Sequence, residues 1–304
     1  MHQSLALVFP GQGAQKVGMA ASFTDHPLYR EHLSLADDIL GIPLSGYILD
    51  GPQEDLTCTE IAQPALLTVA TGVYKVLQAE THKSPMAVAG HSLGEYSALV
   101  AAEALSFETA LKLVQLRGQL MQAACEQASG GMSAIIKPDL DQIRGLLKQT
   151  QDQVVMANDN SPQQVVLSGQ IEMLNEICQE IKQKKWGRPV VLKVSGAFHS
   201  PLMSPAREQL GQAIEQTVFF DAQIPIVMNA SAQAVYHAAA IQSLLYKQLT
   251  APVLWQDSIR TLNRHCSGAF LELGANTLSK LIQQTLPDAD VYSLTDFAEI
   301  AGLK

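Results

Sequence analysis

The chain has 304 residues, of which 47% are hydrophobic and 16% are charged, and its formal net charge is −9. This composition is typical of a globular protein and excludes a disordered chain, while the acidic balance excludes a general attraction to nucleic acid or to anionic membranes. The length exceeds the usual size of one hydrophobic core, which indicates one large domain or a domain with an insertion. The apolar segment before Pro10 is too short for a signal peptide, and no uncharged apolar stretch could cross a bilayer, so we expect a cytoplasmic protein.

The four cysteines are far apart in the sequence and form no CxxC pair: Cys58, Cys125, Cys178 and Cys266. No histidine lies near them at the spacing of metal ligands. We therefore expect free thiols in a reducing compartment, without a metal site or a disulfide.

The first part of the chain predicts two short buried strands and a helix. Residues 5–9 are apolar and end at a Pro-Gly-Gln-Gly turn, and residues 60–80 carry apolar side chains at helical spacing. A second apolar run, 86–89, leads directly into Gly-His-Ser-Leu-Gly at 90–94. Ser92 is therefore predicted to lie at a turn from a strand to a helix.

A helix is predicted over residues 107–126, where polar and apolar residues form separate faces. The polar face consists of Glu108, Lys112, Gln115, Gln119, Gln122 and Glu126. Arg117 points away from this face, toward the protein interior. Because an unpaired buried charge is very unfavourable, Arg117 needs an anionic partner.

The middle of the chain predicts four strands and two helices in the order βαββαβ, which is the ferredoxin-like arrangement. The strands are expected at 131–137, 153–157, 163–169 and 189–194, and the helices at 139–150 and 171–185. After them, helices are expected at 202–217, 238–248 and 253–264, and strands at 225–228 and 270–273. We predict an α/β fold in which residues 1–127 and 196–304 form a core with a parallel sheet, and 128–195 form an inserted ferredoxin-like subdomain.

The segment around Ser92 matches GxSxG, the nucleophile elbow of α/β-hydrolase-like folds. Flanking glycines permit a sharp turn, and the amide of Leu93 would lie near a helix N-terminus, where it could stabilise an oxyanion. The pattern alone fits an ordinary strand–helix turn equally well.

A serine nucleophile needs a base, and eight histidines are available: His2, His26, His32, His82, His91, His199, His237 and His265. His199 stands out because it follows a predicted apolar strand, although a histidine in that position often only caps a loop. His91 is adjacent to Ser92, so its side chain should point elsewhere and pack or form a supporting hydrogen bond.

Several ordered segments resemble the motifs of malonyl-CoA:acyl carrier protein transacylases. They are Phe-Pro-Gly-Gln-Gly-Ala-Gln at 9–15, Gln-Pro-Ala at 63–65, Gly-His-Ser-Leu-Gly-Glu-Tyr at 90–96, Arg-Gly at 117–118, Asn-Ser-Pro at 160–162 with Gln-Val-Val at 164–166, Ala-Phe-His-Ser at 197–200, and 248–255. The resemblance implies a catalytic dyad of Ser92 and His199. It also implies that a main-chain carbonyl at Gln248 orients the histidine, and that the main-chain amides of Gln12 and Leu93 form the oxyanion hole.

The resemblance also assigns the substrate pocket. Arg117 is expected to grip the free carboxylate of malonate through its two-pronged guanidinium, although a salt bridge to an internal Asp or Glu remains the alternative. Phe198 would limit the space beside the α-carbon and disfavour methylmalonyl groups. Gln63, Met121 and Asn160 are expected to line the pocket, while a purely structural role for the two amides carries equal weight.

The activity implied is transfer of a malonyl group from malonyl-CoA, the substrate, to the phosphopantetheine thiol of holo acyl carrier protein in fatty acid synthesis. No permanently bound cofactor and no metal are expected. Two relatives with the same chemistry are alternatives: a free-standing acyltransferase of a polyketide synthase and the loading subunit of a malonate decarboxylase. From other classes, a serine esterase and a catalytically silent binding module remain open; Arg117 on an apolar face and a histidine in mid-chain argue against the esterase.

Overall fold

The computed structural model describes residues 5–266 and 269–303, which form two β-sheets and the helices around them. The large sheet has six strands in the order β10-β9-β1-β2-β7-β8. Its strands are β1 (Leu5–Phe9), β2 (Ala87–Gly90), β7 (Ile226–Val227), β8 (Ala234–Val235), β9 (Ala269–Leu273) and β10 (Asp290–Leu294). The small sheet has four strands in the order β4-β5-β3-β6. They are β3 (Gly130–Ile136), β4 (Val154–Ser161), β5 (Gln164–Gln170) and β6 (Arg188–Val191).

The helices before the small sheet are α1 (Pro27–Leu40), α2 (Leu44–Leu49), α3 (Gln53–Thr57), α4 (Thr59–Thr81), α5 (Gly94–Ala101) and α6 (Phe107–Gln127). Within the small-sheet segment they are α7 (Leu140–Leu147) and α8 (Ile171–Gln183), and after it α9 (Ser204–Gln216), α10 (Ala238–Gln248), α11 (Trp255–Asn263) and α12 (Ser279–Thr285). Short 3-10 helices lie at η1 (Ala21–Phe23), η2 (Pro201–Met203) and η3 (Phe297–Leu303).

The parallel sheet predicted from the sequence is present, with one antiparallel strand at its edge. Strands β10, β9, β1, β2 and β7 are mutually parallel, whereas β8 pairs with β7 in the antiparallel sense. The short connection between β7 and β8 explains this difference, because a tight turn can join only antiparallel neighbours.

Both faces of the large sheet are buried, which explains why its strands are almost continuously apolar. In β1, Leu7 and Phe9 contribute to one hydrophobic cluster, which includes side chains of α4, α5 and α6. Ala6 and Val8 contribute to the opposite cluster, which includes side chains of α11 and α12. The helices therefore hold the ends of β1 and β2 in a fixed position.

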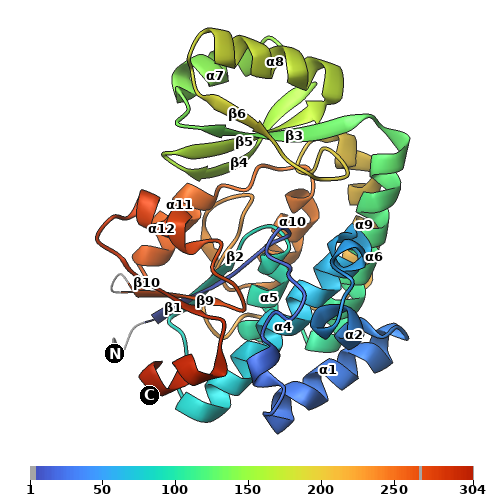
Figure 1. Cartoon of the computed structure of the whole chain (residues 1–304), viewed down its shortest axis with the longest axis vertical. Helices are drawn as coiled ribbons and strands as arrows, with labels where there is room; N and C mark the ends of the chain where they lie inside the picture. Colours follow the sequence, from blue (N-terminus) through green and yellow to red (C-terminus); the bar gives the residue numbers. More distant parts are fainter. Residues whose placement is uncertain (1–4, 267–268, 304) are drawn as a thin grey trace.

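The small sheet is entirely antiparallel and follows the predicted order βαββαβ. Figure 1 shows α7 and α8 on its outer side and the larger body of the molecule on the other. Ile135, Val165 and Leu167 of the sheet form a separate core with Ile143 of α7 and Ile177 of α8.

Strand β4 joins the small sheet to the rest of the molecule. The main-chain N–H of Asp159 donates to the carbonyl of Val253 (2.9 Å), and the N–H of Val253 donates to the carbonyl of Ala157 (2.8 Å). The Ser161 hydroxyl also donates to the side-chain oxygen of Gln284 in α12 (2.6 Å). Register shifts between β4 and β5 lie between Met156 and Asn158 and between Asp159 and Ser161, at the residues that make these contacts.

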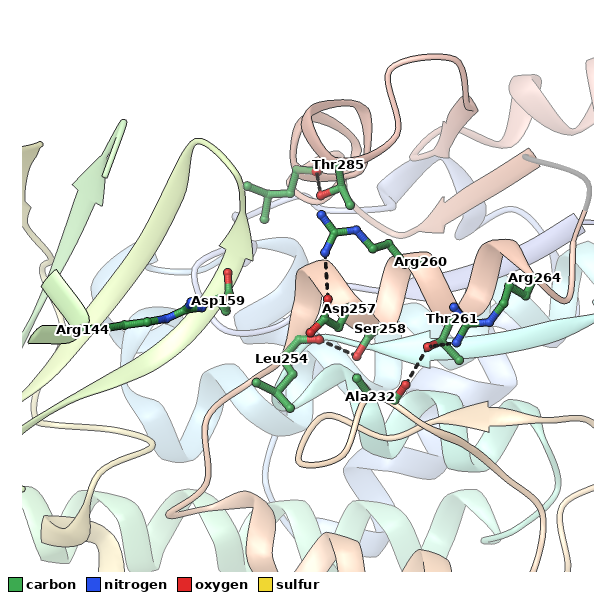
Figure 2. Close-up of polar contacts among 11 residues, drawn as sticks. Arg144, Asp159, Ala232, Leu254, Asp257, Ser258, Arg260, Thr261, Arg264 and Thr285 are labelled. Atoms are coloured by element: carbon green, nitrogen blue, oxygen red, sulfur yellow. Dashed lines mark hydrogen bonds and ion pairs between the residues drawn. The ribbon is translucent and has the colours of Figure 1, made fainter. Parts of the chain in front are cut away.

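Charged side chains continue this junction on the surface. Figure 2 shows Arg144 of α7 and Asp159 of β4 facing Asp257 and Arg260 of α11. The Arg144 guanidinium lies 3.7 Å from the Asp159 carboxylate, and Arg260 donates to Asp257 at 2.8 Å. Burial raises the pKa of Asp159, and Asp257 adds to the effect, while Arg144 and Arg260 oppose it. The exposed arginines thus offset part of the cost of burying Asp159.

Cys58, Cys125 and Cys178 are free thiols. Within residues 5–266 and 269–303, no helix is both long enough and apolar enough to cross a membrane. In the same ranges, no three His, Cys, Asp or Glu side chains gather in a way that could hold a metal ion.

Candidate active site

Ser92 lies at the turn between β2 and α5, with a positive φ of 51°. Positive φ is unusual for a residue other than glycine and marks a strained turn of the kind that holds nucleophiles. The neighbouring glycines are required by space: a Cβ on Gly90 would overlap the main chain of Gly94, and one on Gly94 would overlap the carbonyl of Phe9. The glycines of the motif therefore allow the turn to pack against the end of β1.

The Pro-Gly-Gln-Gly turn after β1 lies beside this elbow, because β1 and β2 are parallel neighbours and Phe9 is paired with Gly90. Gly11 is so close that a Cβ there would overlap the carbonyl of His91. In the described part of the chain, the main-chain N–H groups of Gln12 and Leu93 have no protein acceptor. These two amides, which the family resemblance implies form an oxyanion hole, are thus available to a ligand.

His199 lies within hydrogen-bonding distance of the serine: its Nε2 is 2.7 Å from the Ser92 hydroxyl oxygen. Its Nδ1 lies 2.9 Å from the main-chain oxygen of Gln248 and 3.2 Å from that of Ala251. Because carbonyl oxygens only accept, Nδ1 carries the proton and Nε2 is left to accept from the serine.

Electrostatics keep His199 neutral. The side chain is buried, and burial, followed by the nearby charge of Arg117, lowers its pKa to about 3. A neutral imidazole facing a hydroxyl can act as a general base.

Arg117 of α6 is almost completely buried, with 1% of its surface exposed. Its Nη1 donates to the side-chain oxygen of Gln63 (2.7 Å), and its Nη2 donates to the side-chain oxygen of Gln248 (3.1 Å) and to the Ser92 hydroxyl (3.2 Å). Its Nε has no partner among the described residues. Within the same residues, Arg117 forms no ion pair with an Asp or Glu, so the direct internal salt bridge considered above is not observed. The guanidinium retains capacity for an external anion.

A cavity of about 550 Å³ connects these groups and is bordered by both sheets. Among the predicted site residues, those that line it are Gln12, Ser92, Arg117, Met121, Asn160, Phe198 and His199. Gln63 and Gln248 lie behind the cavity and contact Arg117 instead, while Leu93 is buried next to Ser92. From the small sheet, Met132, Ala134 and Val166 add an apolar wall.

His91 points away from the reacting hydroxyl, as expected from its place at the elbow. Its Nε2 lies 2.8 Å from the side-chain oxygen of Asn160, and its ring packs edge-on against Trp255. The Asn160 amide donates to Gln164 at 3.0 Å. Asn160 thus ties the elbow to the small sheet and also borders the cavity.

Two residues near the site were not singled out from the sequence. Glu95, the second residue of α5, has no exposed surface, and burial raises its pKa to about 7. Asn229, two residues after the end of β7, accepts from the Ser92 N–H (2.7 Å) and donates to the Gly90 carbonyl (2.7 Å). Two signals in the sequence could have identified them. Glu95 is a charged residue in a largely apolar helix, and Asn229 is a polar residue near the carboxyl end of a parallel strand.

The chain is similar to known proteins over nearly its whole length. The model of the acyl transferase domain family matches residues 6–301. The chain is 38% identical to the malonyl CoA-acyl carrier protein transacylase of Bacillus subtilis over 288 residues, covering 92% of this chain and 90% of that protein. With the enzyme of that name from Haemophilus influenzae, the identity is 38% over 310 residues, covering 99% and 98% of the two chains.

Solved structures match over a similar extent. The malonyl CoA-acyl carrier protein transacylase of Coxiella burnetii superposes with a TM-score of 0.95 at 35% identity, covering 100% of this chain and 97% of that one. A malonyl-transacylase in complex with its type II PKS acyl-carrier protein superposes with a TM-score of 0.93 at 35% identity and 98% coverage of both chains. The chain therefore belongs to the acyl transferase domain family and, within it, to the malonyl CoA-acyl carrier protein transacylases.

Proposed function

We propose that this protein transfers the malonyl group of malonyl-CoA to the phosphopantetheine thiol of holo acyl carrier protein, through an ester on Ser92, and so supplies fatty acid synthesis. The observation that carries the proposal is the presence of three groups in one cavity: a serine in contact with a neutral histidine, and a buried arginine with no carboxylate partner among the described residues. A hydrolase acting on neutral esters has no need for such a cation.

In the first half-reaction, Nε2 of His199 takes the proton of the Ser92 hydroxyl as the serine oxygen attacks the thioester carbonyl. The main-chain N–H groups of Gln12 and Leu93 stabilise the oxyanion. The carbon–sulfur bond then breaks, the protonated His199 returns the proton to the coenzyme A thiolate, and the malonyl ester remains on the serine. Main-chain carbonyls suffice to orient His199 because a thiolate is a good leaving group.

The second half-reaction runs the same steps with the carrier protein. His199 takes the proton of the phosphopantetheine thiol, whose sulfur attacks the ester carbonyl. The bond to the Ser92 oxygen breaks, and His199 returns the proton to it. Because both donor and acceptor use the same serine, they must bind in turn, which is a ping-pong mechanism.

Arg117 selects the acyl group in this proposal. A planar guanidinium offers two parallel N–H groups to a carboxylate. Nε has no partner among the described residues, and the adjacent Nη2 would complete the pair by turning to the carboxylate the N–H that it now donates to the Ser92 hydroxyl. Phe198 and Met121 line the cavity, and in this proposal they limit the space for a branch on the α-carbon. We therefore expect malonyl groups to be favoured over methylmalonyl groups.

The proposed function also implies a division of the chain into a catalytic core and an inserted subdomain, and a cytoplasmic location. Residues 1–127 and 196–304 form an α/β-hydrolase-like core, and residues 128–195 form a ferredoxin-like subdomain inserted into it. The strained elbow at the end of β2 supports the first part, and the strand order β4-β5-β3-β6 supports the second. The enzyme acts in the cytoplasm on malonyl-CoA, without a permanently bound cofactor.

The test is intact-protein mass spectrometry after mixing with malonyl-CoA, followed by addition of a holo carrier protein. The wild type should gain one malonyl group, which peptide mapping places on Ser92, and should lose it to the carrier. A Ser92→Ala variant should remain unmodified and serve as the control. Absence of the adduct in the wild type, or release as free malonate in the presence of carrier, would contradict the proposal and favour an inert binding module or an esterase. Carriers from fatty acid and polyketide systems, compared side by side, identify the partner.

A further inference from the structure

Glu95 is an unusual residue for the interior position that it occupies. Its side chain is fully buried, and in the part of the chain that the structure describes it makes no ion pair with a cation. One carboxylate oxygen accepts from the main-chain N–H of Asn229 (2.5 Å), and the other accepts from the side-chain amide of Gln248 (2.6 Å). Since stability alone would favour an apolar residue there, the contacts of this carboxylate deserve a functional explanation.

The Glu95 carboxylate, together with the main-chain oxygen of Ser92, determines the orientation of the Gln248 side-chain amide. A carboxylate can only accept, so the NH2 group of Gln248 must face Glu95. The amide oxygen is then turned toward Arg117, whose Nη2 donates to it at 3.1 Å. The same NH2 group also donates to the main-chain oxygen of Ser92 at 2.8 Å. By accepting from the NH2 group of Gln248, Glu95 keeps the amide oxygen of Gln248 turned toward the guanidinium of Arg117.

We propose that Glu95 is a positioning residue for acyl-group selection: through the amide of Gln248 it aims Arg117 at the carboxylate of the bound acyl group. This inference rests on the proposed function, because it assigns the anion at Arg117 to the malonyl group. The role differs from that of the carbonyl of Gln248, which orients His199, since it uses the side chain of the same residue.

The negative charge of Glu95 also supports the proposed role of Arg117. The charged and titratable groups that face it are Arg117 from α6 and Tyr96 from α5, whereas Asn229 and Gln248 are uncharged. The Glu95 carboxylate is separated from Arg117 by the side chain of Gln248. At that distance it compensates part of the buried positive charge of Arg117 and leaves the guanidinium free for a ligand. A carboxylate in direct contact would occupy that place instead.

The decisive variant is Glu95→Gln, which keeps the shape and removes the charge. Its amide oxygen must stay on the N–H of Asn229, so its NH2 group would face Gln248 and reverse that amide. Two donor groups would then face each other at Arg117. The second-order rate of Ser92 acylation, followed by rapid quench and mass spectrometry, should fall about 10- to 100-fold more with malonyl-CoA than with acetyl-CoA.

Glu272→Gln is the matched control. Glu272 is also fully buried, and its carboxylate accepts from main-chain and hydroxyl groups of Thr277, Leu278 and Ser279, away from the cavity. This variant should unfold at a lower temperature while its malonyl-to-acetyl rate ratio stays at the wild-type value.

A second variant, Gln248→Met, breaks the same link from the other side and keeps the main-chain carbonyl that faces His199. It is informative if Glu95→Gln does not fold, and it should lower the same rate ratio. Equal losses for malonyl and acetyl groups in the folded variants would overturn the positioning role of Glu95. If the wild type itself forms no malonyl ester, the proposed function fails; if it does and the ratio is unchanged in the variants, only this inference fails.

Discussion

The large parallel sheet and the small antiparallel sheet both border the cavity, and they present different groups to it. At the large sheet, β1 and β2 end side by side and deliver the turn that contains Gln12 and the elbow that contains Ser92. At the small sheet, Met132, Ala134 and Val166 project from the middle of paired strands. Main-chain N–H and C=O groups at the ends of parallel strands have no partner strand, whereas those within a sheet form hydrogen bonds with the neighbouring strands. The end of the large sheet therefore presents the proposed nucleophile and the proposed oxyanion-hole amides, whereas Met132, Ala134 and Val166 of the small sheet form an apolar wall.

The largest effect on the rate of acylation is expected when the proposed base is removed. His199→Ala leaves the elbow intact but removes the acceptor for the serine proton, so the rate of acylation by malonyl-CoA should fall about 10²- to 10⁴-fold. The measurement is the rapid-quench assay of the malonyl adduct, with circular dichroism to verify folding. A folded variant that retains acylation within about tenfold of the wild type would show that another group acts as the base.

The next largest effect is expected for the buried cation. Arg117→Ala removes the proposed anion site, and its loss should lower malonyl acylation on the order of 100-fold, which corresponds to about 3 kcal/mol. Acetyl acylation should change much less, because the acetyl group carries no carboxylate. Equal losses with the two acyl groups would assign Arg117 a structural role.

A larger side chain on the apolar wall tests whether the small sheet only shapes the cavity. Ala134→Leu adds volume at a residue that lines the cavity, and it should raise the KM for malonyl-CoA about tenfold with kcat nearly unchanged. The matched control is Ile135→Val, on the opposite face of β3, which should lower stability by about 1 kcal/mol and leave KM unchanged. A large decrease in kcat for Ala134→Leu would mean that the small sheet takes part in the chemistry.

The smallest expected effect is a dependence on pH. The lowered pKa of His199, about 3, keeps the base neutral from pH 6 to 8, so acetyl acylation should be nearly flat in this range. Glu95 has a raised pKa of about 7, so it gains a proton as the pH falls through 7 and then loses an acceptor for Gln248. The malonyl-to-acetyl rate ratio should therefore rise from pH 6 to pH 8 in the wild type and stay constant in Glu95→Gln.

The raised pKa of Glu95 also predicts the sign of a change in stability. Between about pH 4.5 and 7 the folded state holds a proton that the unfolded chain has released, so Glu95 makes folding less favourable as the pH rises through this window. The melting temperature of the wild type should decrease relative to that of Glu95→Gln from pH 5 to pH 8. A constant difference between the two proteins would show that Glu95 does not titrate in this range.

Much of the architecture could be predicted from local patterns. Apolar runs indicated β1 and β2, helical periodicity indicated α6, and the alternation in the middle of the chain indicated the order βαββαβ. The glycines around Ser92 predicted its turn because backbone conformation and close packing depend on neighbouring residues. His199 stood out as a candidate base from its place after a predicted strand, but its pairing with Ser92 and the role of Gln248 were assigned only through the family resemblance, since nothing near them in the sequence specifies a partner a hundred residues away.

The sequence by itself therefore determined several of the elements, the turn at Ser92 and the burial of Arg117, all of which follow from short-range pattern, whereas α1, α12 and β10 were not predicted. Only the tertiary structure decided that Arg117 is held by the amides of Gln63 and Gln248, and that Glu95 and Asn229 support the elbow from behind. It also decided the antiparallel pairing of β8, whose two residues are too few for a periodic signal. The physical reason is that a hydrogen bond between distant residues depends on where the fold brings their atoms, and no local pattern records that position.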